Sequence, residues 1–268
     1  MGVRVSAGSY YSVASPIHAL DPRVKLTVAV AFMVSCLAVD DIATLAVAGA
    51  FCIGSVLAAR VPLGRLLAQI RPVIAFLVLT SVLNLVFVHT GELVFALGPL
   101  ELHTGGIAAA ALYTLRFLLL LLMGALLMLT TQAMALTDAA ERLLAPLERT
   151  GVPVGELCLV LSIALRFVPT LGREARHIAV AQTARGAALE GKGAIAYARE
   201  CIPLVVPLFA SALRHAEHLA RAMDARCYTG GVGRTHYHAL RFDARHDGAA
   251  VAAAVLYLIA LALLKTLL

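Results

Sequence analysis

The sequence predicts an all-α membrane protein with five to seven membrane segments and two amphipathic coupling helices in the cytoplasm. Hydrophobic residues make up 61% of the chain and charged residues only 14%, whereas a soluble domain has about a quarter charged residues. The mean hydropathy is +0.89. Several apolar runs also approach the roughly 20 residues that a helix needs to cross a bilayer.

Five apolar runs come close to or exceed the lower limit of about 17 residues for a membrane helix. Two further runs, 152–170 and 201–213, contain charged residues or prolines, and they could be spans, half-buried helices or a hairpin dipping into the membrane. We expect no signal peptide, because the first 22 residues lack an apolar core. The five runs lie at 24–39, 42–59, 72–88, 105–132 and 249–264.

The distribution of basic residues predicts the topology. Segment 60–71 carries three arginines and region 138–246 holds 14 of the 22 lysines and arginines, whereas the turn at Asp40 and Asp41 and the loop 90–104 carry none. The positive-inside rule then places the N-terminus and the basic region in the cytoplasm. We therefore expect N-terminal membrane helices in 1–137, a cytoplasmic or interfacial coupling region in 138–246 and a final span in 247–268.

Arg116 is a charged residue inside the long run 105–132. It could extend toward the nearer membrane surface, which is the interpretation we favour. It could instead face the helix bundle and have a partner there.

The basic region is predicted to form helices that lie at the membrane surface. A first helix begins after an N-cap at Thr137 or Asp138. Two alanine-rich helices follow, near 172–190 and 212–228. Gly186 is expected to loosen or end the first of them.

No residue pattern predicts catalysis, a cofactor or a metal site in this chain. The apolar cores of the predicted spans contain no carboxylate or histidine, and there is no GxSxG or phosphate-binding lysine motif. The five cysteines form no CxxC pair. The histidines of "HAEH" at 215–218 do not have the HExxH spacing, and "HYH" at 236–238 is better explained as a solvated loop.

Two arginines in the basic region stand out because each is flanked by small residues. A basic cytoplasmic loop explains arginines in general, through topology alone. Small neighbours, however, let a helix end approach another surface closely, and a guanidinium then offers five donors to carboxylates in a groove. The two sites consist of Ala184, Arg185 and Gly186, and of Ala225, Arg226 and Cys227.

These features together resemble the T component of energy-coupling factor (ECF) transporters, including its cobalt and nickel branch. "SPIHALDPRVKL" at 15–26 is similar to the family's entry motif, and "GVPVGELCLVLSIALRFVPTL" at 151–171 to the segment before its first long cytoplasmic helix. The two arginine stretches resemble the family's paired Ala-Arg-Gly motifs. The resemblance covers about 8–260. Asp21 and Pro22 of the entry motif are also typical of a helix start, with Asp as N-cap and Pro at N1.

The resemblance implies a coupling role without catalysis, in the plasma membrane of a prokaryotic cell. Arg185 and Arg226 would each dock into a groove near acidic residues on one of two ABC-type ATPase subunits, which would bind the ATP and Mg. A separate small membrane S component would bind a vitamin or a transition metal, and the apolar surfaces of 152–213 are the candidate contact with it. Cys227 departs from the family pattern, where glycine or serine is more usual.

Three other functions remain open at this point. A gradient-driven secondary transporter or channel would act without ATP, although the missing mid-span carboxylates argue against it. An intramembrane enzyme would need a catalytic pair deep in the membrane. A membrane anchor for some other cytoplasmic complex would also expose arginines. The sequence identifies neither the substrate nor whether the two ATPases are alike.

Overall fold

The computed structural model describes residues 10–97, 100–186, 194–230 and 242–267. The described chain divides into two compact units. One, which we call the bundle unit, contains residues up to 139 and from 242 onward. The other, the α8–α9 unit, contains the residues from 140 to 230.

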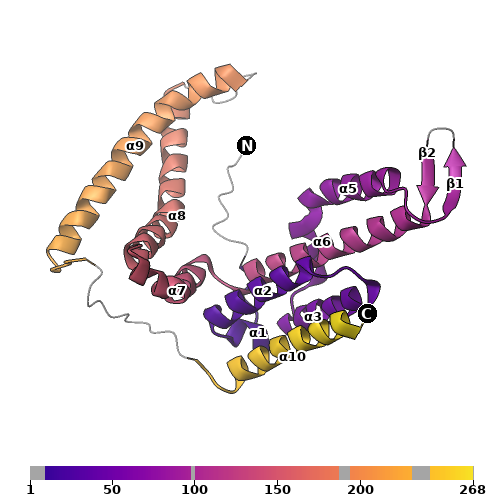
Figure 1. Cartoon of the computed structure of the whole chain (residues 1–268). Coiled ribbons are helices and arrows are strands. Elements are labelled where there is room, and N and C mark those ends of the chain that lie inside the picture. The colour runs from indigo at the N-terminus through magenta and orange to yellow at the C-terminus, as the bar shows by residue number, and fades with distance from the viewer. Residues whose placement is uncertain (1–9, 98–99, 187–193, 231–241, 268) are drawn as a thin grey trace. The chain divides into compact units, whose positions relative to one another are not determined.

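The structure is mainly helical, as predicted (Figure 1). The elements that begin before the α8–α9 unit are α1 (Pro16–Ala19), α2 (Pro22–Leu37), α3 (Ile42–Ala59), α4 (Leu63–Ile70), the 3-10 helix η1 (Arg71–Val73), α5 (Ile74–Phe87), β1 (Leu93–Leu97), β2 (Leu100–His103), α6 (Thr104–Thr130) and α7 (Ala133–Leu144). The later elements are the 3-10 helix η2 (Ala145–Thr150), α8 (Val154–Ala184), α9 (Ala194–Asp224) and α10 (His246–Leu267).

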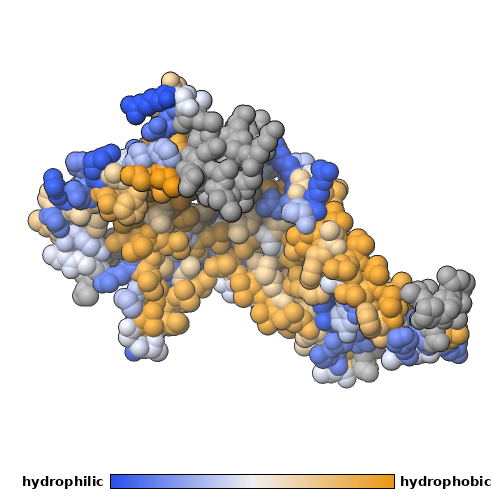
Figure 2. Space-filling view, turned by 90° about the horizontal axis from the view of Figure 1, so that it is seen from above, coloured by the Kyte–Doolittle hydropathy of each residue, from blue (hydrophilic) through white to orange (hydrophobic). Residues whose placement is uncertain are grey.

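Five helical segments among the described residues are long and apolar enough to cross a membrane. Hydrophobic side chains also cover much of the surface visible in Figure 2. Five is the lower end of the predicted range of membrane segments, but the five helices are not the five apolar runs that the sequence predicted as spans. The predicted span 24–39 forms α2, which has only 16 residues and is not among the five, whereas α8 is. The five are Ile42–Ala59, Leu63–Phe87, Thr104–Thr130, Val154–Ala184 and His246–Leu267.

The helices of the α8–α9 unit are longer than the sequence predicts. Helices α8 and α9 have 31 residues each and continue through Pro169, Pro203 and Pro207. A proline inside a helix removes one hydrogen bond and costs about 3 kcal/mol, but long flanks of good helix formers on both sides outweigh that cost. The boundaries predicted near 172 and 212 are therefore wrong.

Two further local predictions need correction. Thr137 is not an N-cap, because α7 begins four residues earlier and the Thr137 hydroxyl donates to the Ala133 carbonyl at 3.0 Å. The acidic loop 90–104 contains an antiparallel hairpin in which Leu93 is opposite His103 and Leu97 is opposite Leu100. Gly105 follows it where a Cβ would collide with Thr90.

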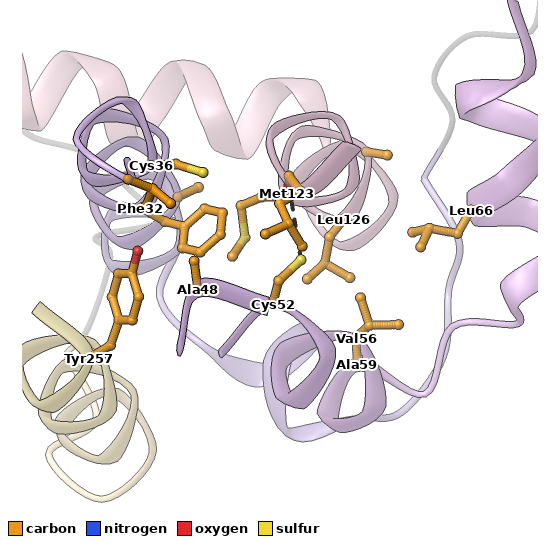
Figure 3. Close-up of a cluster of buried hydrophobic side chains, with 14 of the residues drawn as sticks. Phe32, Cys36, Ala48, Cys52, Val56, Ala59, Leu66, Met123, Leu126 and Tyr257 are labelled. Atoms are coloured by element: carbon orange, nitrogen blue, oxygen red, sulfur yellow. Dashed lines mark hydrogen bonds between the residues drawn. The ribbon is translucent and has the colours of Figure 1, made fainter. Parts of the chain in front are cut away.

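The core of the bundle unit lies between α2, α3, α6 and α10 (Figure 3). Phe32, Phe51 and Tyr257 bring three helices together through ring contacts, with centroids 4.7 to 5.7 Å apart. Cys36 and Cys52 are fully buried in the same cluster and act as small apolar residues. This core fixes the relative positions of the helices within the unit.

A buried carboxylate joins the start of α2 to the start of α10. Asp21 caps α2, since its side chain accepts the Arg23 amide at 2.8 Å, as the sequence predicts. The Asp21 amide in turn donates to Asp247 Oδ1 at 2.8 Å, and the Asp243 amide donates to Asp247 Oδ2 at 2.7 Å. Asp247 is only 1% exposed. It therefore satisfies two backbone donors that would otherwise be orphaned.

The rest of the entry motif packs around a lysine. The Lys25 ammonium donates to the carbonyls of His18 at 3.0 Å and Thr130 at 3.4 Å, which ties α2 to the end of α6. The His18 ring contacts Ser15 Oγ at 2.6 Å and the Tyr11 carbonyl at 2.9 Å. Burial lowers the pKa of His18, because the charged ring would lose hydration. The motif thus forms a polar network within the bundle unit.

Arg116 has a specific partner, as the second of our two interpretations requires. Its guanidinium lies 3.2 Å from Asp40, and the Arg116 side chain is 13% exposed. Lys265 reaches the same carboxylate at 3.4 Å. Asp40 thereby joins the end of α2 to the middle of α6 and to the end of α10.

Candidate functional site

The first arginine site lies where α8 ends. The Arg185 amide bonds to the Ala181 and Gln182 carbonyls at 3.3 and 3.1 Å, so the backbone is still in its last helical turn. The Gly186 amide bonds to Thr183 at 2.9 Å, and Gly186 has φ +89°. A left-handed glycine after the helix is a common C-terminal cap. Gly186 therefore turns the backbone away from the axis of α8 directly after Arg185.

The second site repeats this geometry where α9 ends. The amides of Arg226 and Tyr228 both bond to the Met223 carbonyl at 3.0 Å. Cys227 has φ +58°, and Arg60 is the other non-glycine residue with positive φ in the described chain. Cys227 therefore adopts the left-handed conformation that Gly186 adopts in the first site. Cys227 thus replaces the glycine or serine of the family pattern, and α9 still ends in the same way as α8.

Both guanidinium groups are available to an external acceptor. Arg185 and Arg226 are exposed, and neither side chain makes a hydrogen bond or ion pair with another residue that the structure describes. Each also lies at a helix C-terminus, where the helix dipole favours a cation. Two exposed, similarly presented arginines are a suitable pair of contacts for carboxylates on a binding partner.

The two arginines are far apart on one antiparallel helix pair. Gln182 Nε2 donates to the Pro203 carbonyl at 3.5 Å, and Ser211 Oγ donates to Glu174. Both bonds fit one antiparallel register, in which Arg185 lies beside position 200. At a rise of 1.5 Å per residue, Arg226 is then roughly 40 Å further along α9. The pair thus presents one arginine near each end (Figure 1).

A small polar cluster holds α8 against α9 between the two sites. Ser211 is 4% exposed and donates to Glu174 across the interface. His215 bonds to the Ser211 carbonyl at 2.9 Å, and its ring contacts Phe167 with centroids 6.2 Å apart. The cluster is not a catalytic triad, since Glu174 is bonded to the serine rather than to the histidine. Its role is to fix the two helices in register.

One face of α9 carries an exposed apolar stripe. Its five residues recur at helical spacing and are each 51–65% exposed. Among the described residues of the α8–α9 unit, no apolar residue buries them, so a surface outside this unit must cover this face. The five are Ile202, Val205, Val206, Phe209 and Leu213.

Comparison with known proteins places these features in a family. The profile of the family described as CbiQ, cobalt transport protein, matches residues 13–237, which include both arginine sites. The energy-coupling factor transporter transmembrane protein EcfT of Thermosediminibacter oceani is 40% identical over 252 residues, covering 94% of this chain and 95% of the relative. The chain belongs to the CbiQ/EcfT family. The Bacillus subtilis EcfT protein is 39% identical over 249 residues, covering 93% and 94%.

A further member of this CbiQ/EcfT group is built differently. The putative ABC transporter ATP-binding protein of Bifidobacterium longum is 43% identical over 247 residues, which cover 92% of this chain but only 32% of that protein. This chain therefore spans about a third of that relative's length. A segment similar to a CbiQ/EcfT protein thus occurs within a longer protein that is named as ATP-binding.

The structure also shows contacts that the sequence did not predict. Asp247, the Asp40–Arg116 pair and the Glu174–Ser211 bond each join residues far apart in the chain. Asp247 could have been noticed as an acidic residue at the N-terminal end of a predicted span. No group of three or more potential metal ligands lies among the described residues. The "HYH" stretch falls outside those residues.

Proposed function

We propose that this chain is the transmembrane scaffold of an ECF-type ABC importer. It couples ATP hydrolysis by two cytoplasmic ATPase subunits to the reorientation of a separate substrate-binding membrane subunit, for uptake of a vitamin or a transition metal. Family membership supports the transporter class. The observation that carries the coupling role is the pair of equivalent, exposed arginines at the ends of α8 and α9.

The arginines act as anchors, and the helices transmit movement. Each guanidinium docks into an acidic groove of one ATPase, where bidentate hydrogen bonds fix its direction. The separation of roughly 40 Å along the pair allows the two sites to engage two different subunits. When the subunits bind ATP and Mg and approach each other, both helix ends shift. The Bifidobacterium longum relative supports the pairing with an ATPase, since its name describes an ATP-binding protein.

The apolar stripe of α9 is the proposed contact with the S component. Its five exposed residues lie on the helix that ends at Arg226, so movement of that anchor displaces the stripe directly. Apolar side chains without polar partners can also slide against another apolar helix at little cost. This chain itself holds no cofactor in the proposal, and its N-terminus lies in the cytoplasm.

The decisive experiment purifies the chain gently from its native membrane and identifies its partners by mass spectrometry and ATPase assay. We expect two ABC ATPase subunits and one small membrane protein. Arg185→Glu and Arg226→Glu together should release the ATPases, since like charge in an acidic groove costs several kcal/mol. Arg173→Glu is the matched control, because Arg173 is exposed on α8 away from its end. It should leave assembly intact.

Each rival function predicts a different outcome. A chain that purifies alone and moves a solute into liposomes without ATP would be a secondary transporter or channel. A different cytoplasmic complex bound through the arginines would make the chain a membrane anchor. Retention of the ATPases by the double variant would contradict the assigned role of the two arginines.

A native cysteine allows docking to be followed at one site. Cys227 is exposed next to Arg226, whereas Cys36, Cys52 and Cys158 are buried. A maleimide should therefore modify Cys227 in the free chain and react much more slowly when the ATPase is bound. Labelling of Cys227 at an unchanged rate in the complex would place the ATPase elsewhere.

A further inference from the structure

The bundle unit contains a cavity of about 430 Å³. This volume lies in the range of small-molecule sites, roughly 300–1,000 Å³. Its walls come from α1, α2, α3, α6 and α10, and most of its lining is apolar. Three of those helices, α3, α6 and α10, are candidate membrane spans. The cavity is therefore built into the membrane part of the protein.

Small residues create the cavity between α3 and α10. Gly54 and Ala58 on α3 are exposed and face Ala249 and Ala253 of α10 across it. Small residues on neighbouring membrane helices normally permit close backbone contact. Here they leave a gap instead, with Phe51 among the larger residues that line it.

A buried lysine supplies a second observation, and it points to an anion. Lys25 lines the cavity and is only 8% exposed. It donates to two carbonyls, but no ion pair joins it to any carboxylate that the structure describes. The neighbouring carboxylates of Asp21 and Asp247 accept backbone amides instead. Burial makes the Lys25 ammonium costly, and the nearby negative charges of Asp247 and Asp21 offset that cost only in part.

Two more basic residues lie at the same end of the cavity. Arg245 and His246 line it where α10 begins, and both are exposed. Arg245 has no ion pair with another described residue, and His246 is bonded to Asp243 at 2.7 Å. The cavity thus combines an apolar body with a cationic end at the helix termini, where a membrane surface lies.

We propose that this cavity binds one anionic phospholipid. An acyl chain lies between the small residues of α3 and α10, and the phosphate lies against Lys25 and Arg245. Basic pockets between membrane helices are known to select anionic headgroups. The phosphate adds a further negative charge beside Lys25, whose burial Asp247 and Asp21 offset only in part. The proposal depends on the membrane spans and not on the coupling role of Arg185 and Arg226.

The test is native mass spectrometry of the full chain, in the complex with which it purifies, after incorporation into discs of equal parts phosphatidylglycerol and phosphatidylcholine. We expect one retained phosphatidylglycerol. Gly54→Leu should remove it by filling the cavity. Gly49→Leu is the matched control on α3, since neither glycine has an atom within 4 Å of an added Cβ and Gly49 does not line the cavity.

A second variant tests the charge without altering the buried network. Arg245→Gln should lower the preference for phosphatidylglycerol over phosphatidylcholine roughly fivefold, the expected contribution of one basic residue near a membrane surface. Arg71→Gln, at an exposed arginine outside the cavity, should not. Equal lipid retention by Gly54→Leu and Gly49→Leu would overturn the proposal. So would a photo-reactive residue at position 58 that cross-links to another subunit instead of to lipid.

Discussion

The bundle unit and the α8–α9 unit use apolar residues in opposite ways. In the bundle unit, a cluster of buried side chains and a buried carboxylate hold several helices together. In the α8–α9 unit, the described residues that are buried are Val154, Cys158 and Ser211. Yet α8 and α9 are no less helical and carry many exposed aliphatic side chains. The difference indicates that the bundle unit is held together by its own core, whereas the apolar side chains of α8 and α9 are largely left for a surface outside their unit.

The largest expected difference between the two units is in the effect of replacing one phenylalanine of each by alanine. Phe32 is 1% exposed in the bundle core, and Phe209 is 65% exposed on the α9 stripe. Phe32→Ala should lower the free energy of unfolding by about 3–5 kcal/mol, through lost packing. Phe209→Ala should change it by less than about 0.5 kcal/mol but weaken co-purification of the S component. Equilibrium unfolding in mixed micelles measures the first effect, and equal losses in both variants would contradict the comparison.

The buried carboxylate gives the next largest effect. Asp247→Ala leaves the amides of Asp21 and Asp243 without acceptors, and each unsatisfied buried group costs about 1–3 kcal/mol. We expect a loss of about 2–5 kcal/mol in the same unfolding measurement. Asp247→Asn keeps one acceptor oxygen and should lose less. If Asp247→Ala left the free energy of unfolding unchanged, the link between the entry motif and α10 would be dispensable for stability.

Within the α8–α9 unit, we expect a smaller and local effect. Ser211→Ala removes the donor to Glu174, and a hydrogen bond to a charged group contributes about 1.5–3 kcal/mol. Hydrogen exchange of amides in α8 and α9 should become faster, while exchange in the bundle helices stays the same. Ser162→Ala, at a serine of α8, is the control. Faster exchange throughout the chain would mean that the two units do not open independently.

The lengths of the apolar runs and the short motifs correctly predicted the features that are determined by residues close together in the sequence. Span 42–59 agrees with α3, and 105–132 agrees closely with α6, because each apolar run ends where its helix ends. The Asp21 cap was also predicted, since Asp followed by Pro is a local helix-start signal. The two arginines were singled out for their small neighbours, which are likewise visible in the sequence.

Features that depend on distant residues were not predictable in this way. Arg116 and Asp40 are 76 positions apart, and nothing local in the sequence pairs them. The prolines at 169, 203 and 207 are ordinary helix breakers, and only the finished helices show that their flanks outweigh them. The left-handed conformation of Cys227 was not expected either, because a non-glycine residue there carries backbone strain.

That strained residue provides the smallest and most specific test. Cys227→Gly should stabilise the end of α9 by roughly 0.5–1 kcal/mol, because glycine adopts positive φ without a Cβ penalty. It should also leave ATPase binding unchanged, since the geometry would then match that of Gly186 at the first site. Cys227→Val should have the opposite effect, because a β-branched residue is poorly tolerated at positive φ. Unfolding of α9 followed by hydrogen exchange, together with ATPase retention, measures both. If Cys227→Val kept full ATPase binding, the left-handed turn after Arg226 would not be what presents that arginine, and the equivalence of the two sites would rest on the arginines alone.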